Sequence, residues 1–381
     1  MLSISFEQLR FIFLKRWSLT LRKIFIFAVT FLTSLILVSC DSPSSDSLTD
    51  SASQDVMSSS SAEIKPPFLI SKVGAFHVGG ELVKVHEANV DASESGTVFA
   101  NQLMVRYLLP ATDDLKSPVV MMPGYGLASD IYLETPDGRE GWAMQFVQVG
   151  YPVYLVEPAN STRAGINPEI LNAHIRGRQS APAQLFTWAQ ELTWTRFGFG
   201  PAEGEFFADG RMPRDSFDQL VKMFTPTQVE NVDGPAIIMY GLADNLRGMN
   251  ELMDMIGPSI LLVHSATGVP GFVYTAQNPD DILAIINVEP VGCPAANSEE
   301  FPDVPVLSMF ADHMEVREQM PIRQDECQSV VDELKNRGVP ADMMSLPEMG
   351  IVGNSHLPMS ELNSAELASL LINWLDENSI N

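Results

Sequence analysis

Basic residues are scarce in this sequence. Lys and Arg total 23 against 48 Asp and Glu, so the formal net charge is −25 over 381 residues. Nucleic acids and anionic membrane surfaces recruit basic patches, so this balance argues against both as partners. We interpret the acidity as a solubility feature of an exported surface rather than as a sign of the substrate.

Cysteine is also rare. Of the three cysteines, Cys40 lies near the amino terminus, which leaves Cys293 and Cys327. An exported protein reaches a compartment that permits disulfides. The sequence does not show whether these two residues meet in space, so a bond between them stays open.

The amino terminus resembles a bacterial lipoprotein signal. Five basic residues precede an apolar run from Ile24 to Val38, which ends in Leu37-Val38-Ser39-Cys40. The run is shorter than the ~20 residues of a membrane span and suits the core of a signal peptide. We expect residues 1–39 to be removed and Cys40 to be lipidated. An uncleaved membrane anchor is the alternative.

Residues 40–66 are rich in Ser and Asp and contain few bulky apolar groups, which is typical of a linker that does not fold. The rest of the chain is apolar enough to fold, because 45% of the whole sequence is hydrophobic. We therefore expect one α/β domain over residues 67–381. No internal repeat interrupts it.

The stretch from Ile260 to Gly268 reads as a buried strand that leads into a nucleophile elbow. Four aliphatic residues suit a strand buried on both faces, and Ser265 follows on the turn. Val263 and Thr267 occupy the positions where the usual elbow has glycine. A plain strand whose serine caps the next helix is the alternative.

Other strand-like segments surround this one. They comprise Phe68 to Val78, Glu81 to His86, Thr97 to Leu109, Pro118 to Met122, Tyr151 to Val156, Ile282 to Val288, Val304 to Phe310 and Ala341 to Leu346. Gly79-Gly80 predicts a hairpin turn between the first two. Helical patterns cover Glu140 to Val149, Pro235 to Ile256, Ile322 to Arg337 and Glu361 to Asp376.

Residues 166–231 break the alternation of strands and helices. Aromatic residues are scattered there among glycines and prolines: Trp188, Trp194, Phe197, Phe199, Phe206, Phe207, Phe217 and Phe224. The segment predicts a cap inserted between strands of the sheet. Its aromatic side chains either line an apolar substrate pocket or, for most of them, form a small core of the cap.

The order of polar residues along the chain carries the functional prediction. A Pro123-Gly124-Tyr125-Gly126 loop follows one strand, Ser265 follows another, a carboxylate follows a third, and His356 lies in a late loop before the final helix. This is the order of catalytic parts in α/β hydrolases. Serine needs an imidazole to take its proton, and the imidazole needs a carboxylate to fix its tautomer.

The other histidines do not fit that order. His264 is expected to be structural, and His77, His86, His174 and His313 lie outside any triad sequence. We predict backbone N–H donors from Tyr125 and Ala266 for the oxyanion. The sequence suggests no metal ion and no organic cofactor.

The chain resembles a subgroup of bacterial α/β-hydrolase esterases whose elbow reads His-Ser-Gln-Ser-Gly. The specific stretches are Gly74 to Gly80, Thr135 to Trp142, Gly257 through Gly268, Val288-Glu289-Pro290 and Gly353 to His356. Two departures stand out: Ala266-Thr267 replaces Gln-Ser, and Pro123 to Gly126 replaces a His-Gly-Cys-Cys loop. The resemblance implies an α/β-hydrolase fold, with a mostly parallel twisted sheet, helices on both faces and an inserted cap.

The resemblance also implies that Glu289 is the acid, with Ser265 as nucleophile and His356 as base. Generic topology favours Asp312 instead, which follows the next strand. Pro290, directly after Glu289, gives that strand a sharp exit that would hold the carboxylate at its carboxyl end. We therefore place Glu289 ahead of Asp312.

These patterns predict a serine esterase that forms an acyl-enzyme with a small, apolar ester. The alternative from another class is a catalytically degenerate hydrolase-fold lipoprotein that only binds a ligand. Acyl transfer to an alcohol other than water shares the same residues. We expect a lipid-anchored protein of the cell envelope, on its periplasmic or extracellular face. A homodimer is compatible with the sequence, which does not set the oligomeric state.

Overall fold

The computed structural model describes residues 69–179, 183–230, 241–317 and 319–381. The expected signal peptide (1–39), Cys40 and the linker (40–66) lie outside these residues, as do Phe68 and the first six residues of the helix expected from Pro235. Within the described ranges, no helix combines the length and apolar character that crossing a bilayer requires.

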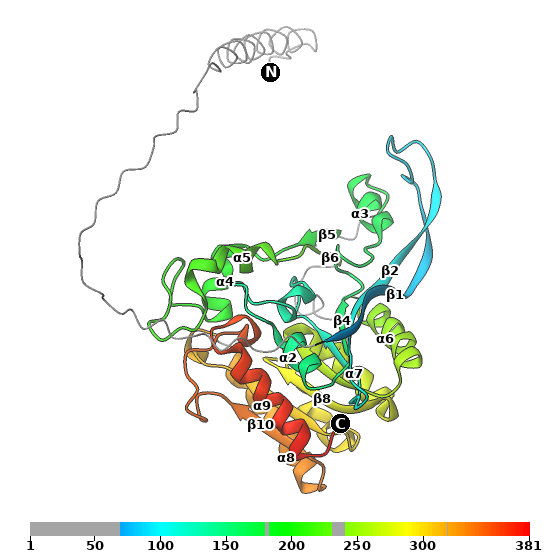
Figure 1. The fold of residues 1–381 in the computed structure, drawn as a ribbon. Coiled ribbons are helices and arrows are strands. Elements are labelled where there is room, and N and C mark those ends of the chain that lie inside the picture. The colour runs from blue at the N-terminus through cyan, green and yellow to red at the C-terminus, as the bar shows by residue number, and fades with distance from the viewer. Residues whose placement is uncertain (1–68, 180–182, 231–240, 318) are drawn as a thin grey trace, which may run out of the picture. The chain divides into compact units, whose positions relative to one another are not determined.

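A mixed sheet forms the centre of the fold (Figure 1). Its spatial order is β1-β2-β4-β3-β7-β8-β9-β10, where β1 and β2 are antiparallel to their neighbours and β4 to β10 are parallel to one another. The strands are β1 (Ile70–Val85), β2 (Gly96–Pro110), β3 (Val119–Met122), β4 (Val153–Glu157), β7 (Ser259–His264), β8 (Ile282–Val288), β9 (Val306–Phe310) and β10 (Ala341–Ser345).

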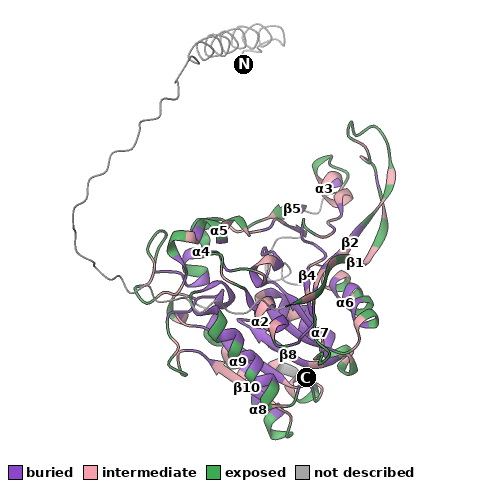
Figure 2. Cartoon of the chain, viewed as in Figure 1, coloured by how far each residue is buried: buried purple, intermediate pink, exposed green. Residues whose placement is uncertain are grey.

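Helices cover both faces of this sheet, and this explains the uninterrupted apolar runs of its strands. The α-helices are α2 (Trp142–Gln148), α3 (Pro168–Ile175), α4 (Gln190–Phe197), α5 (Phe217–Lys222), α6 (Leu242–Ile256), α7 (Gly268–Gln277), α8 (Met320–Asn336) and α9 (Ser364–Glu377). Along β7, Ile260 and Leu262 pack in the core that includes α2 and α9. Leu261 and Val263 pack in the core that includes α6, α7 and α8. Figure 2 shows the resulting buried sheet.

The chain therefore has the predicted α/β-hydrolase fold, with a cap inserted between β4 and β7. Within the described residues, the cap contains α3, α4, α5 and a two-stranded antiparallel sheet of β5 (Ala183–Phe186) and β6 (Thr227–Glu230). In Figure 1, its helix α4 lies above α9.

The predicted hairpin turn at Gly79-Gly80 is wrong. β1 runs through both glycines without reversing, and it pairs with β2 along its length, with Val78 opposite Leu103. The glycines serve a different purpose: both have positive φ, and a Cβ on Gly79 would lie 2.8 Å from the backbone of Gly248 in α6. A local pattern of two glycines does not distinguish a turn from a site where another backbone approaches closely.

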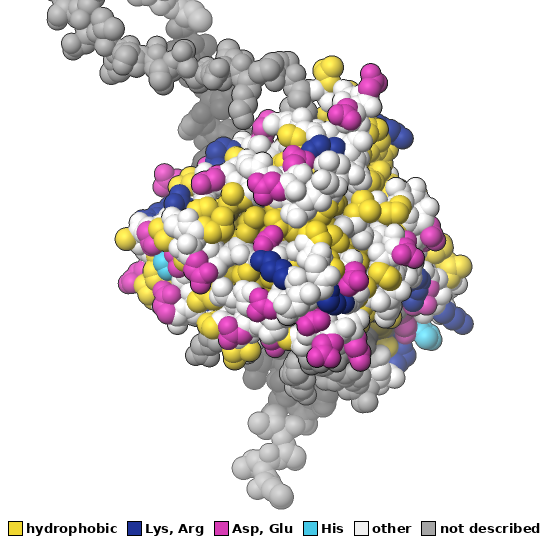
Figure 3. All heavy atoms as spheres, turned by 90° about the horizontal axis from the view of Figure 1, so that it is seen from below, with side chains coloured by type: hydrophobic (Ala, Val, Ile, Leu, Met, Phe, Trp, Pro, Cys, Tyr) yellow, Lys and Arg dark blue, Asp and Glu magenta, His cyan; other side chains and the backbone are white. Residues whose placement is uncertain are grey.

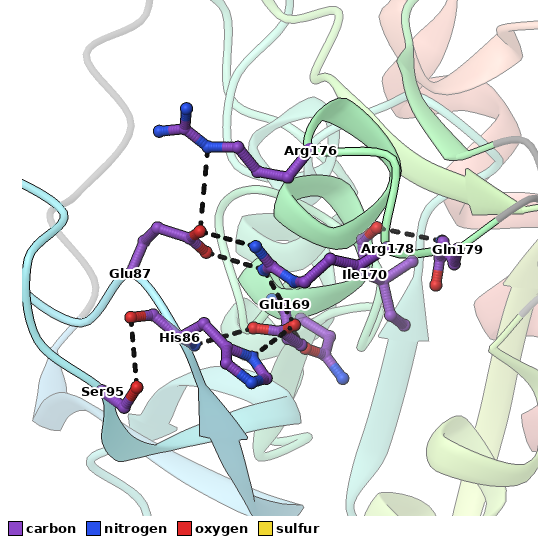
Figure 4. Close-up of polar contacts among 9 residues, drawn as sticks. His86, Glu87, Ser95, Glu169, Ile170, Arg176, Arg178 and Gln179 are labelled. Carbon is purple, nitrogen blue, oxygen red and sulfur yellow. Dashed lines mark hydrogen bonds and ion pairs between the residues drawn. The ribbon is translucent and has the colours of Figure 1, made fainter.

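Charged side chains connect the end of the β1–β2 hairpin where the chain turns, just after β1, to α3 of the cap (Figure 4). Arg178 donates to both carboxylate oxygens of Glu87, at 2.7 and 2.8 Å, and also to Glu169. Glu169 in turn accepts from the backbone of His86 and contacts its Nδ1. Bidentate Arg–carboxylate geometry fixes orientation as well as distance, so the cluster aligns the hairpin with the cap.

The structure answers the question of the two cysteines that the sequence left open. Cys293 and Cys327 are bonded, which links the loop after β8 to α8. On the face drawn in Figure 3, acidic side chains are spread widely and Lys and Arg are few, as the net charge of −25 implies.

Candidate active site

Ser265 follows the last residue of β7 in a strained conformation. Its φ is +54°, in the left-handed region that residues with a side chain seldom occupy. The turn continues into a short 3-10 helix, η4 (Ser265–Thr267), and then α7. Such strain persists only where the surroundings enforce it, and it is a recurring feature of functional sites.

Thr267 shows how this elbow is built without the usual glycine. Its hydroxyl lies 3.0 Å from the carbonyl of Met122 and 2.8 Å from that of His264, and it accepts from the His264 amide. The side chain therefore takes part in the turn's own hydrogen bonding. Its position is compatible with the elbow because its polar atom satisfies backbone groups that the turn leaves free.

The structure brings Ser265, His356 and Glu289 together. His356 Nε2 lies 2.9 Å from Ser265 Oγ, and His356 Nδ1 lies 2.9 Å from Glu289 Oε2. Glu289, which follows β8, is fully buried, whereas Ser265 is half-buried. The backbone of His356 donates to the carbonyl of Phe197, the last residue of α4, at 2.7 Å. The cap therefore contributes directly to the position of the imidazole.

Asp312, the other candidate acid, lies elsewhere. Its carboxylate accepts from the Gly353 amide at 2.9 Å and from the amide of His313 at 2.7 Å. Asp312 thus caps the loop after β9. Its backbone N–H also donates to the carbonyl of Asn354, so it helps to hold the segment that leads to His356.

Sequence reasoning missed Arg317. Its guanidinium pairs with Glu289 Oε2, and both side chains are buried almost completely. The Ala311 amide donates to the other oxygen of Glu289. Nothing local in the sequence marks Arg317 as a partner of Glu289, because the two are joined only by the way β8, β9 and the following loop converge.

These contacts decide the charge of the buried carboxylate. Burial by itself would raise the pKa of Glu289, but the adjacent Arg317, followed by His356 and the Ala311 amide, more than offsets this and lowers it to about 2. Burial lowers the pKa of His356, and the contact with Glu289 offsets only part of that effect. At neutral pH the site therefore holds a carboxylate and a neutral imidazole.

His264 is structural, and the structure shows what it does. Burial, together with the nearby His356, lowers its pKa to about 3, so its ring is neutral. Nδ1 accepts from the Gly124 N–H at 3.1 Å, which assigns the proton to Nε2, and Nε2–H donates to the His356 carbonyl at 2.8 Å. One ring therefore joins the glycine loop after β3 to the loop of His356.

Tyr125 and Ala266, the expected oxyanion donors, line one narrow cavity of about 30 Å³ beside the elbow. The Gly124 carbonyl accepts from the Leu127 amide, so the Tyr125 N–H of the same planar peptide points the other way. A Cβ on Gly124 would lie 2.7 Å from His264 Nδ1 and 2.8 Å from Ser265 Cβ. Glycine is therefore required where this loop passes the serine.

The aromatic residues of the cap form two sets that meet where Phe197 packs on Phe199, with ring centroids 5.9 Å apart. Trp194, Phe199, Phe206 and Phe217 pack on one another with ring centroids 4.6–6.4 Å apart. A second set reaches the site: Trp188 packs on Phe197, and the ring of Phe197 lies 5.2 Å from that of His356. Trp188 also donates to the Tyr125 carbonyl at 2.7 Å. The first set forms a small core of the cap, as expected for most of these residues, whereas no ring of the second set is among the residues that line the cavity beside the elbow.

Glu361 holds the loop that carries His356, and the sequence patterns did not indicate this role. One oxygen accepts from the Ser355 amide at 2.7 Å, and the other accepts from the Asn354 side chain. Burial raises the pKa of Glu361 to about 7 despite these donors. The Thr135 to Trp142 segment braces the same region: Arg139 donates to the backbone carbonyls of Glu361 and Leu362, and Trp142 donates to that of Ser364.

The comparisons with known proteins agree with this architecture. No family model matches the sequence. The solved structure of a bacterial esterase is similar to this chain with a TM-score of 0.74 and 29% identity, covering 82% of this chain and 98% of that one. A probable secreted lipase from a fungal species is 24% identical over 324 residues, which is 72% of this chain and 86% of the relative. Together they support placing the chain in the α/β-hydrolase superfamily.

We predict that Arg317→Met destabilises the fold and does so most at high pH. Without the guanidinium, Glu289 remains buried with a charge that burial disfavours, and breaking such a pair costs about 3–5 kcal/mol. The loss shrinks at lower pH, where Glu289 regains its proton. Urea unfolding at pH 8 and pH 5 measures both effects, and Arg317→Lys, which keeps the positive charge, serves as the control. Equal stability of the Met and Lys variants at pH 8 would contradict this account.

We also predict that Glu361 makes the protein less stable as pH rises. The folded pKa of about 7 lies above the ordinary 4.5, so the folded chain holds a proton that the unfolded chain has lost. The associated stability is complete below pH 4.5 and disappears as pH passes 7, by up to about 3 kcal/mol.

Urea unfolding of the wild type and Glu361→Gln between pH 5 and pH 8 tests this difference. The wild type should lose stability relative to the variant over that range. Glu366→Gln, an exposed change on α9, should follow the wild type. Parallel pH curves for the wild type and Glu361→Gln would refute the assignment.

Proposed function

We propose that this protein is a serine hydrolase that cleaves carboxylic esters through an acyl-enzyme. The observation that carries the proposal is the line from Ser265 Oγ through the imidazole of His356 to Glu289, with both contacts at 2.9 Å and Ser265 held at positive φ. The similarity to a bacterial esterase and to a probable secreted lipase supports the same class of reaction.

In the proposed mechanism, Ser265 is the nucleophile and His356 the base. Ser265 Oγ attacks the ester carbonyl while its proton passes to Nε2 of His356. Glu289 accepts from Nδ1–H, which keeps the tautomer that leaves Nε2 free to take the proton, and it stabilises the imidazolium that results. The imidazolium then protonates the departing alkoxide, and water, activated by His356, hydrolyses the acyl-Ser265 bond.

We assign the oxyanion donors to the backbone N–H groups of Tyr125 and Ala266. Both residues line the cavity beside the serine. The peptide that carries the Tyr125 N–H is oriented by the Leu127 amide, which donates to its Gly124 carbonyl, and Trp188 holds the next peptide through the Tyr125 carbonyl. Donors that are fixed before the reaction stabilise developing charge without reorganising. The Thr267 hydroxyl, bonded to the Met122 carbonyl, and the His264 ring, bonded to the Gly124 amide, hold this loop against the elbow.

The substrate we propose is a small apolar ester. Leu127, Pro158 and Pro270 line the cavity that also borders Tyr125 and Ala266, so an acyl or alkyl group entering it would meet apolar side chains. A degenerate, ligand-binding protein is not favoured, because the three reacting side chains are in hydrogen-bond contact. The hydrolase domain would comprise residues 67–381, with the cap over about 166–231.

We predict that Ser265→Ala abolishes ester hydrolysis and labelling by a fluorophosphonate, because both need the serine oxygen. Glu289→Gln should lower kcat by about four orders of magnitude with little change in KM, because its neutral amide does not enforce the productive tautomer. Assays with one activated aryl ester at pH 8 measure both.

Glu300→Gln, an exposed carboxylate change, is the control and should retain wild-type kcat. Circular dichroism checks that each variant is folded. Near wild-type turnover in either the Ser265 or the Glu289 variant would overturn the proposed triad.

We further propose that the protein is exported and lipid-anchored at Cys40. The fungal relative is described as secreted, which agrees with export, and the charged flank, the short apolar run and Ser39-Cys40 support the lipid anchor. The anchor would hold the enzyme at the periplasmic or extracellular face of the envelope.

We predict that full-length protein expressed in bacteria partitions into detergent and loses residues 1–39, whereas Cys40→Ala stays unprocessed. A Cys293→Ser/Cys327→Ser variant is the control and should partition as the wild type does. Mass spectrometry of the mature amino terminus decides the point, and an unmodified Cys40 on a processed chain would refute the anchor.

A further inference from the structure

Three side chains outside the proposed triad converge where the cap meets the loop after β9. Asp209 belongs to the cap, whereas Asp312 and His313 follow β9, and one ligand atom from each lies within 4.8 Å of the others. Asp209 is exposed, Asp312 is partly buried and His313 is buried. Neither acid takes part in the proposed reaction, so the triad does not account for the cluster.

His313 brings to this cluster a buried polar atom that lacks a partner within the part of the chain that the structure describes. Its side chain is only 9% exposed, yet among the described residues its Nε2 has no hydrogen-bond partner. The nearest carboxylate oxygen, on Asp209, lies 3.4 Å away. A buried polar atom without a partner is costly, so such atoms in folded proteins usually have a ligand, an ion or a water.

The imidazole ring is also held in a defined orientation. It stacks on Phe207 with centroids 3.7 Å apart and planes inclined by 8°. Its Nδ1 faces Glu315, with 3.5 Å between the nitrogen and a carboxylate oxygen. A carboxylate on Nδ1 is the arrangement that orients a metal-bound histidine and leaves Nε2 as the ligand atom.

We propose that Asp209, Asp312 and His313 bind a divalent transition-metal ion of the zinc type. The donor set of one imidazole nitrogen and two carboxylates suits Zn²⁺, while Ca²⁺ and Mg²⁺ prefer oxygen ligands throughout. With metal–ligand bonds of ~2.1 Å, neighbouring ligands of a tetrahedral ion are about 3.4 Å apart. The separation between His313 Nε2 and the Asp209 oxygen equals that edge.

The proposed ion would join the cap to the loop after β9, which is itself hydrogen-bonded to the segment that leads to His356. Asp312 already accepts from the Gly353 amide, and the Arg211 amide donates to the Gly353 carbonyl at 3.0 Å. Gly353 lies so close to the cap that a Cβ on it would be 2.0 Å from the Asp209 carbonyl. A metal ligated from both sides would therefore brace the junction, and its role would be structural rather than catalytic.

Isothermal titration of the EDTA-treated full chain with ZnCl₂ tests the site. We expect saturable binding that weakens at least tenfold in Asp209→Asn and in His313→Gln. The matched controls are Asp218→Asn and His77→Gln, which change exposed residues of the same types outside the cluster and should bind as the wild type does. Melting temperature should rise with ZnCl₂ in the wild type and both controls, but not in the two ligand variants.

Co²⁺ provides a second readout, because its visible absorption reports four-coordinate geometry directly. The wild type should show these bands and the Asp209 variant should lose them. Asp209 is exposed, so its variant keeps the test valid even if His313→Gln fails to fold. Zinc affinity that is equal in the wild type and the ligand variants, or an absence of saturable binding, would overturn the proposal.

Discussion

The ion pair between Arg317 and Glu289 is the constraint on which the rest of the site depends. A carboxylate that is completely buried would ordinarily take up a proton, and a protonated acid would not hold the imidazole in its working tautomer. Arg317 reverses this preference and is itself buried, so each charge is compensated mainly by the other. The same guanidinium donates to the Asp312 carbonyl, which fixes the loop after β9 around the carboxylate.

Hydrogen bonds between uncharged groups connect the other parts of the site to one another. His264 is the centre of this arrangement, because its two ring nitrogens contact the glycine loop after β3 and the backbone of His356. A protonated His264 ring could not accept from the Gly124 N–H through Nδ1. The burial that keeps the ring neutral is therefore necessary for this contact. The carboxylate of Glu361 holds the loop of His356 by accepting from the Ser355 amide, and Arg139 holds Glu361 in turn by donating to its backbone carbonyl.

The cap is connected to the end of the sheet that carries the proposed triad through its backbone as well as its aromatic rings. Phe197 accepts from the His356 amide while its ring packs on the imidazole, and Trp188 donates to the Tyr125 carbonyl. A movement of α4 would therefore shift both His356, the proposed base, and the loop of Tyr125, the proposed oxyanion donor. The charged cluster at α3 holds the other end of the cap against the β1–β2 hairpin (Figure 4).

The sequence by itself determined the fold class and the order of its parts. Runs such as Ile260 to Val263 are apolar at every position because helices cover both faces of a parallel sheet, so the strands could be predicted locally. Ser265 and His356 could be proposed as nucleophile and base because each falls at a recognisable point in that order. Only the tertiary structure revealed Arg317, Glu361, the role of His264 and the cysteine bond, since these depend on contacts between segments far apart in the chain. It also corrected Gly79-Gly80, where the reason for glycine is the approach of α6, a neighbour that no local pattern contains.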